Sequence, residues 1–94
     1  MTIHMVKLCV GAETVEDLAD WQTRQMQRLD NPVHHTRMSP KRAEEMLDGG
    51  SIYWVIKRAI RVRQRIIDIR AVADETGRDM CELVFDPNLV RTYA

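Results

Sequence analysis

The sequence lacks the residue patterns on which most recognised catalytic and export motifs depend. Its 94 residues include only two cysteines, Cys9 and Cys81, which form neither a CxxC pair nor another zinc-ligand spacing. It has no P-loop and no dinucleotide-binding glycine motif. It also has no signal-peptide core and no apolar run near the ~20 residues that span a bilayer. These absences predict a reduced cytoplasmic protein without membrane contact.

The chain also lacks net charge. Its 14 basic residues are balanced by 14 acidic residues, so no overall field attracts nucleic acid or anionic lipid. The distribution is uneven, because residues 37–70 carry nine basic residues against four acidic ones. Residues 1–94 suit a single domain. The basic character is therefore concentrated in the central third of that domain.

The first third of the chain predicts a strand followed by a helix. The apolar, partly β-branched run from Ile3 to Val10 is typical of a strand. Thr14 and Asp17 have the spacing of a capping box, and apolar residues then recur at helical spacing. We therefore expect a helix from about Val15 to Leu29.

A second, shorter helix is expected after an extended segment over residues 33–38. Ser39-Pro40 offers an N-cap followed by a proline in the first turn, so the helix is expected over about Pro40 to Asp48. Gly49-Gly50 then provides a left-handed C-cap residue and a hinge. The chain is expected to start in a new direction at residue 51.

Residues 52–70 can be interpreted as a helix or as strands. Their β-branched and aromatic content favours strands with a bend near Arg58-Ala59, because a helix would have Arg63 within its apolar stripe. In the strand interpretation one face carries the three arginines of a basic row, Arg61, Arg63 and Arg65, and the other carries Ile60, Val62 and Ile66.

The C-terminal third predicts a hairpin. Thr76-Gly77 is typical of its connection, and residues 81–85 are expected to be the return strand, which ends at Asp86-Pro87-Asn88. The connections after Gly50 are too short for parallel crossovers. The whole order predicts an α+β domain with two helices and a mostly antiparallel, barrel-like sheet.

The basic row suggests a binding function. Alternate residues of a strand lie ~7 Å apart, close to the spacing of phosphates in an extended single strand. Tyr53 or Trp54 can offer a stacking surface for bases, although Trp54 is more typical of a core. RNA or a nucleotide is the expected partner, at a site made of Arg37, Lys41, Tyr53, Lys57, Arg61, Arg63 and Arg65. One alternative is a passive, solvated basic face, and the other is a protein-interaction or regulatory module that self-associates as a homodimer.

Catalysis is a third alternative with less support. His34 and His35 face opposite ways on a strand, so at most one of them can join His4 or a cysteine in a metal site. His35 and Arg37 could instead form a small-molecule pocket. No catalytic residue, metal or cofactor is predicted.

The chain resembles a family of small uncharacterised bacterial proteins, known as a domain of unknown function. The resemblance covers nearly the whole chain. It rests partly on the opening Ile3–Gly11 and above all on two later segments. The first, Gly49-Gly50-Ser51-Ile52-Tyr53-Trp54-Val55-Ile56-Lys57, fits a GGS-[IL]-YWVIK signature, and the second, Arg63-Gln64-Arg65-Ile66, fits RQxI. The resemblance implies no reaction or cofactor. It further implies a likeness to the RNA- and nucleotide-binding PUA and ASCH groups.

This chain differs from that pattern at two places. Relatives usually have glycine at the position of Arg58, which puts a tight turn after Lys57 in doubt, because an arginine resists positive φ. Relatives also continue beyond Tyr93 into a Pro/Arg-rich segment with an FQGW-type motif. The resemblance therefore implies that this domain lacks the C-terminal tail of its relatives.

Overall fold

The computed structural model describes residues 2–37 and 41–92 as two helices and one five-stranded sheet. In chain order the elements are β1 (Met5–Leu8), α1 (Val15–Gln25), β2 (Val33–Thr36), α2 (Ala43–Leu47), β3 (Ser51–Ile56), β4 (Ala59–Ala73) and β5 (Asp79–Arg91). The order of strands in the sheet is β1-β3-β4-β5-β2. Only the β1–β3 pair is parallel. The predicted α+β fold with a mostly antiparallel sheet is confirmed.

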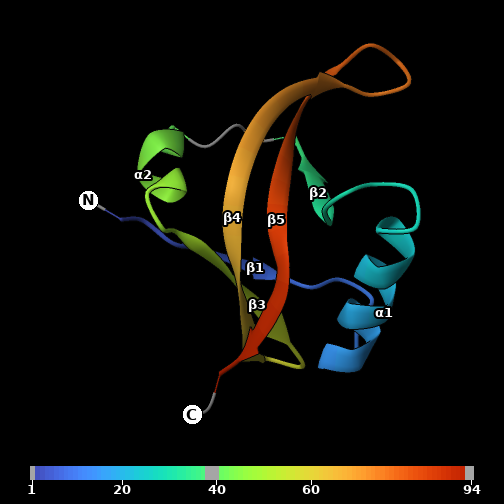
Figure 1. Cartoon of the computed structure of the whole chain (residues 1–94), viewed down its shortest axis with the longest axis vertical. Helices are drawn as coiled ribbons and strands as arrows, with labels where there is room; N and C mark the ends of the chain where they lie inside the picture. The colour runs from blue at the N-terminus through green and yellow to red at the C-terminus, as the bar shows by residue number, and fades with distance from the viewer. Residues whose placement is uncertain (1, 38–40, 93–94) are drawn as a thin grey trace.

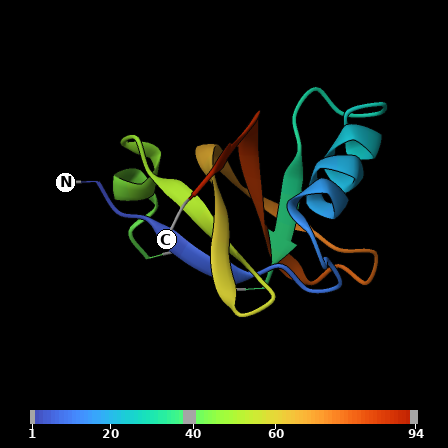
Figure 2. The same cartoon turned by 90° about the horizontal axis from the view of Figure 1, so that it is seen from below.

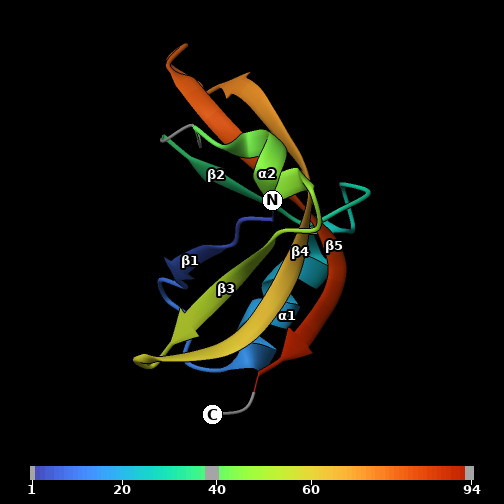
Figure 3. The same cartoon turned by 90° about the vertical axis from the view of Figure 1, so that its left-hand side faces the viewer.

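The sheet is curled into a half-barrel whose edge strands are β1 and β2. The long strands β4 and β5 run through the middle of the molecule, with α1 and α2 on opposite sides of it (Figure 1). Seen from below, the sheet curves so that β1 and β2 approach one another, with α1 beside β2 (Figure 2). The view from the left agrees, with α2 nearest the viewer and α1 behind the strands (Figure 3). Within residues 2–37 and 41–92, neither helix is long and apolar enough to cross a membrane.

The inner face of the curled sheet forms the core. Its largest buried side chains come from alternate positions of β3, β4 and β5, and α1 adds Val15 and Leu18. Alternation is clear in β4, where Val62, Gln64 and Ile66 are buried between exposed arginines. The strand interpretation of residues 52–70 is therefore confirmed.

One residue of that interpretation faces the other way. Ile60 was expected beside Val62 on the inner face, but it is exposed. A bulge explains the difference, since Val55 pairs with Ile60 while the preceding Trp54 pairs with Val62. The extra residue, Arg61, changes the alternation at this point.

Several helices and strands are shorter than expected. The first strand and the first helix are shorter than Ile3–Val10 and Val15–Leu29, although the capping box of Thr14 and Asp17 is confirmed. The short helix begins at Ala43, and the expected N-cap at Ser39-Pro40 lies outside the described residues. Gly49 has the expected positive φ, +82°.

The last strand is longer than expected. Asp86-Pro87-Asn88 does not end β5, which continues to Arg91. Ile66 pairs with Phe85 and Gln64 pairs with Leu89, so these three residues bulge out opposite one residue of β4. A proline can be accommodated within a strand at such a bulge because no ladder hydrogen bond requires its missing N–H.

Helix α1 is attached to the sheet by a pair of buried amides. Gln22 is 5% exposed and Gln64 only 1% exposed. Each side chain donates to the other, at 2.8 Å from Gln22 Nε2 and 2.7 Å from Gln64 Nε2. Gln64 Oε1 also accepts from Trp54 Nε1, and Gln64 Nε2 donates to the carbonyl of Asp86. The two amides therefore join α1, β3, β4 and the β5 bulge.

The turn between β3 and β4 forms without glycine. Lys57 and Arg58 occupy it with φ of 51° and 68°. Both values lie in the left-handed region that two-residue hairpin turns require and that residues with a Cβ disfavour. The tight turn is thus present, at a conformational cost to the fold.

Replacing Arg58 by glycine should relieve part of this cost. We expect Arg58→Gly to raise the free energy of unfolding by about 0.5–1 kcal/mol, because glycine adopts this φ freely. Urea unfolding measures the change. Arg58→Ala is the matched control, since it removes the guanidinium but keeps the Cβ. Equal stability of the glycine and alanine variants would contradict the explanation.

Candidate functional sites

The basic row lies along β4 on the outer face of the sheet. Arg61, Arg63 and Arg65 are all exposed, in alternation with the buried Val62 and Gln64. Arg61 Nε donates to the carbonyl of Ile56 at 3.2 Å, which holds its side chain beside the β3–β4 turn. The alternation places Arg63 and Arg65 on one side of the strand. Arg61 lies at the bulge, and its side chain lines a hollow with Glu13 and Glu16 at the start of α1.

No ion pair to a described carboxylate neutralises the basic row. By contrast, Arg42, Arg70 and Arg91 pair with Glu45, Asp68 and Glu16, respectively. Lys57 and Arg58, at the adjacent turn, are also exposed and make no such pair with residues 2–37 or 41–92. The positive charge here is therefore available to an external partner.

The other predicted binding residues are divided by the fold. Tyr53 pairs with Arg63 across β3 and β4, and its ring meets His4 edge-on at 5.5 Å. Lys41 precedes α2, which packs against β4. Arg37 follows β2 and is separated from β4 by the whole of β5. The structure thus brings Tyr53 and Lys57 to the basic row, whereas Arg37 belongs to the other edge of the sheet.

A cleft of about 330 Å³ opens where the two edge strands approach one another beside α1. Its inner wall is Trp54, whose ring meets Phe85 at 5.9 Å and His34 at 5.6 Å, both edge-on. Trp21 of α1 forms an outer wall and is 38% exposed. The remaining lining includes Leu18, Cys9, Gln25 and Lys7. Aromatic rings therefore form much of the wall.

Two nitrogen-bearing side chains face this cleft from opposite edge strands. Lys7 pairs with Trp54 in the β1–β3 ladder and shares its inward direction. His34 lies on β2. Burial lowers the pKa of His34, and the positive charges of Lys7 and His35 lower it further. The lowered pKa favours the neutral form of His34, and Lys7 is the only cation among the described residues that line the cleft.

Sequence reasoning missed Lys7 as a site residue. The first strand is apolar on both faces, since Val6 and Leu8 are exposed while Met5 and Cys9 face inward. Its one charged residue would ordinarily be placed on the solvent side. One signal could have placed Lys7 on the inner face. Met5, Lys7 and Cys9 are spaced by two, and alternate residues of a strand point to the same face.

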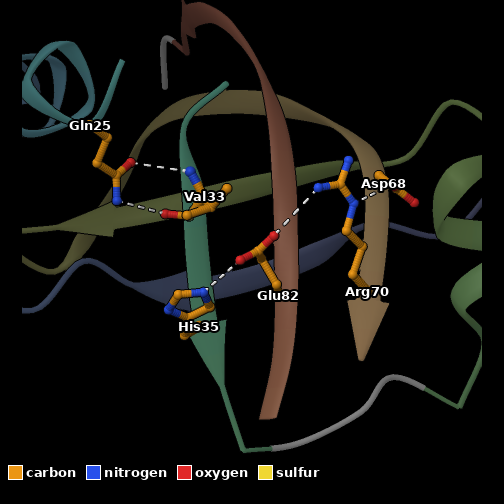
Figure 4. A network of polar contacts seen from close by, with 6 residues as sticks. All are labelled: Gln25, Val33, His35, Asp68, Arg70 and Glu82. Atoms are coloured by element: carbon orange, nitrogen blue, oxygen red, sulfur yellow. Dashed lines mark hydrogen bonds and ion pairs between the residues drawn. The ribbon is translucent and has the colours of Figure 1, made fainter. Parts of the chain in front are cut away.

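His35 points away from the cleft, to the outer face of β2. Its Nε2 lies 2.8 Å from Glu82 Oε2 on β5, and Glu82 Oε1 lies 3.7 Å from Arg70, which binds Asp68 (Figure 4). His35 and Glu82 also line an open hollow beside the β4–β5 hairpin. Arg37 is not part of that lining, so the two residues of the proposed catalytic pocket do not share this hollow.

Gln25 covers part of the free edge of β2. Its side-chain Nε2 donates to the carbonyl of Val33, and its Oε1 accepts from the N–H of Val33, both at 3.1 Å (Figure 4). An amide side chain thus replaces one residue of a neighbouring strand. These two hydrogen bonds protect the edge of β2 from pairing with another chain. They also hold the end of α1 beside the cleft.

The cysteines are buried, as expected, and carry no disulfide. Burial raises the pKa of Cys9, with a further rise from Asp17, and burial alone raises that of Cys81. Both thiols are therefore protonated at neutral pH and poor nucleophiles. Among the described residues, no three histidine, cysteine, aspartate or glutamate side chains gather as metal ligands do.

Comparison with known proteins identifies the family. The model of the family described as "Protein of unknown function (DUF1489)" matches residues 5–94. The chain belongs to the DUF1489 family. No curated protein and no solved structure matches it. The likeness to PUA and ASCH domains stays a prediction.

In this DUF1489 member, the residues that first indicated the family have structural roles. A Cβ on Gly50 would lie 2.3 Å from the carbonyl oxygens of both Ile3 and Met46, so only glycine fits there. Trp54 and Gln64 belong to the buried hydrogen-bonded group that attaches α1 to the sheet. The basic row alternates with these structural residues on the opposite face.

Proposed function

We propose that this DUF1489 domain is a non-catalytic module that binds single-stranded RNA along the outer face of β3 and β4. The observation that carries the proposal is the basic row of three exposed arginines without a carboxylate partner among the described residues. Arg63 and Arg65 lie ~7 Å apart along the strand, which suits successive phosphates of an extended chain, and Arg61 adds a third positive charge at the bulge. A strand within a sheet holds these side chains at fixed intervals, which lowers the entropy lost on binding.

The outer face also offers a surface for bases. Val6, Tyr53 and Arg63 lie side by side across β1, β3 and β4, because each pairs with the next in the sheet. Tyr53 is half-buried and its ring packs edge-on against His4, so its position is set by the fold, and its exposed part offers a surface for stacking. Base stacking on an aromatic ring tolerates any sequence. This combination supports binding with little base specificity.

Self-association through β1 is the second candidate. Val6 and Leu8 are 63% and 60% exposed on an edge strand of only four residues. An exposed apolar edge strand readily pairs with a second sheet. The exposed edge of β1 would then be an interface between two copies of the chain.

The RNA proposal predicts a salt dependence that the arginines control. Fluorescence anisotropy with a labelled single-stranded 12-mer RNA should give a slope of log K against log salt of about −2 for three neutralised phosphates. Arg63→Gln/Arg65→Gln should reduce that slope to about −0.7 and weaken binding at low salt.

The matched control changes two exposed arginines elsewhere. Arg24 and Arg28 lie at the end of α1 and just after it, so Arg24→Gln/Arg28→Gln makes the same change of net charge. It should leave affinity and slope unchanged. An equal loss in both variants would show only a general charge effect, and absence of binding at low salt would reject the proposal.

The self-association candidate predicts a concentration-dependent mass. Size exclusion with light scattering should show a shift from 11.0 kDa toward twice that value at high concentration. Leu8→Lys should keep the protein monomeric, because it places a charge in the apolar contact. Ile67→Lys, at another exposed apolar position, is the control and should dimerise normally. A wild-type chain that stays monomeric to millimolar concentration excludes this candidate.

A further inference from the structure

The cleft between β1, β2 and α1 has walls suited to a flat ring. Trp21 stands on one side, where its ring packs so close to the backbone of Gly11 that a Cβ on Gly11 would lie 3.2 Å from Trp21 Cη2. Trp54 lies at the inner end, backed by the fully buried Phe85. The volume of about 330 Å³ is at the small end of ligand pockets, which run from ~300 to 1,000 Å³. The two tryptophans in the lining and the small volume favour one planar ligand.

Most polar groups of the cleft are already bonded within the protein. Gln22 bonds to Gln64, and Gln25 bonds to the backbone of Val33. The indole N–H of Trp54 donates to Gln64. These contacts hold the walls in place, and they leave few side chains that can recognise a ligand.

Lys7 is the charged group that remains. It is half-buried, faces inward beside Trp54, and makes no ion pair with any carboxylate of residues 2–37 and 41–92. A partly buried ammonium without a counter-ion attracts an anion strongly, because the surroundings screen its charge poorly. His34, on the opposite strand, can donate one ring N–H to the same group.

We propose that the cleft binds a small planar aromatic molecule that carries one anionic group. Its ring lies between Trp21 and Trp54, and its carboxylate or phosphate binds Lys7, with His34 beside it. This site is separate from the basic row, which lies on the opposite face of the same sheet, so neither proposal depends on the other.

The two tryptophans of the chain both line the cleft, so their indole N–H signals report on it directly. Naphthalene-2-carboxylate is a suitable probe, and naphthalene-2-carboxamide is its uncharged counterpart. In ¹H–¹⁵N spectra of labelled protein, the carboxylate should shift both indole signals in a saturable way. The amide should bind about tenfold more weakly, because it lacks the charge-assisted bond to Lys7.

Lys7→Met tests the cation, with Lys57→Met as the control at an exposed turn. Lys7→Met should bind the carboxylate and the amide equally, and Lys57→Met should keep the tenfold preference. The remaining amide signals show whether each variant is folded. To test the source of the anion, naphthyl phosphate replaces the carboxylate, and tighter binding identifies a phosphate ligand.

Three results would overturn the proposal. The first is a pair of indole signals that stay in place at millimolar naphthalene-2-carboxylate. The second is equal affinity of wild type for the carboxylate and the amide, because Lys7 would then have no part in recognition. The third is a short RNA that shifts both indole signals where the carboxylate does not, which would assign the cleft to nucleic acid.

Discussion

The structure depends on the hydrogen bonds between two buried amides, those of Gln22 and Gln64. Each is almost fully buried, and each is satisfied only by the other and by groups around it. A buried amide without a partner costs about 1–3 kcal/mol, so α1 is strongly held to the one position that satisfies both. The position of α1 in turn decides where Trp21 and Gln25 stand at the cleft. The shape of the cleft thus follows from one polar contact in the core.

The same strand separates the two candidate binding surfaces. In β4 the inward residues Val62, Gln64 and Ile66 build the core, and the outward residues include Arg63 and Arg65 of the basic row. Because side chains alternate, a change on one face need not disturb the other. The two proposed binding surfaces can therefore occupy opposite faces of the same sheet.

Local signals in the sequence were sufficient for much of the fold. The capping box at Thr14, the left-handed Gly49 and the β-branched run of β4 each depend on near neighbours, and all were predicted correctly. The basic row followed from simple alternation. The bulges at Arg61 and Pro87 could not be read from the sequence, because they arise from how two strands pair.

The cleft was beyond sequence reasoning for a related reason. Its walls come from β1, α1 and β2 together with residues of β3 and β5 that lie far away in the chain. Gln22 and Gln64 are 42 positions apart, and nothing local marks them as partners. Long-range contacts of this kind depend on the order of strands, which the hydrophobic pattern does not specify.

A double-mutant cycle on the two amides tests this account most directly. Gln22→Leu and Gln64→Leu each leave buried polar groups unpaired, whereas the double variant removes both halves of the pair. Denaturant unfolding should show that the double variant loses less free energy than the sum of the single variants, by about 1–3 kcal/mol. Losses that add within about 0.5 kcal/mol would contradict the central role of the pair.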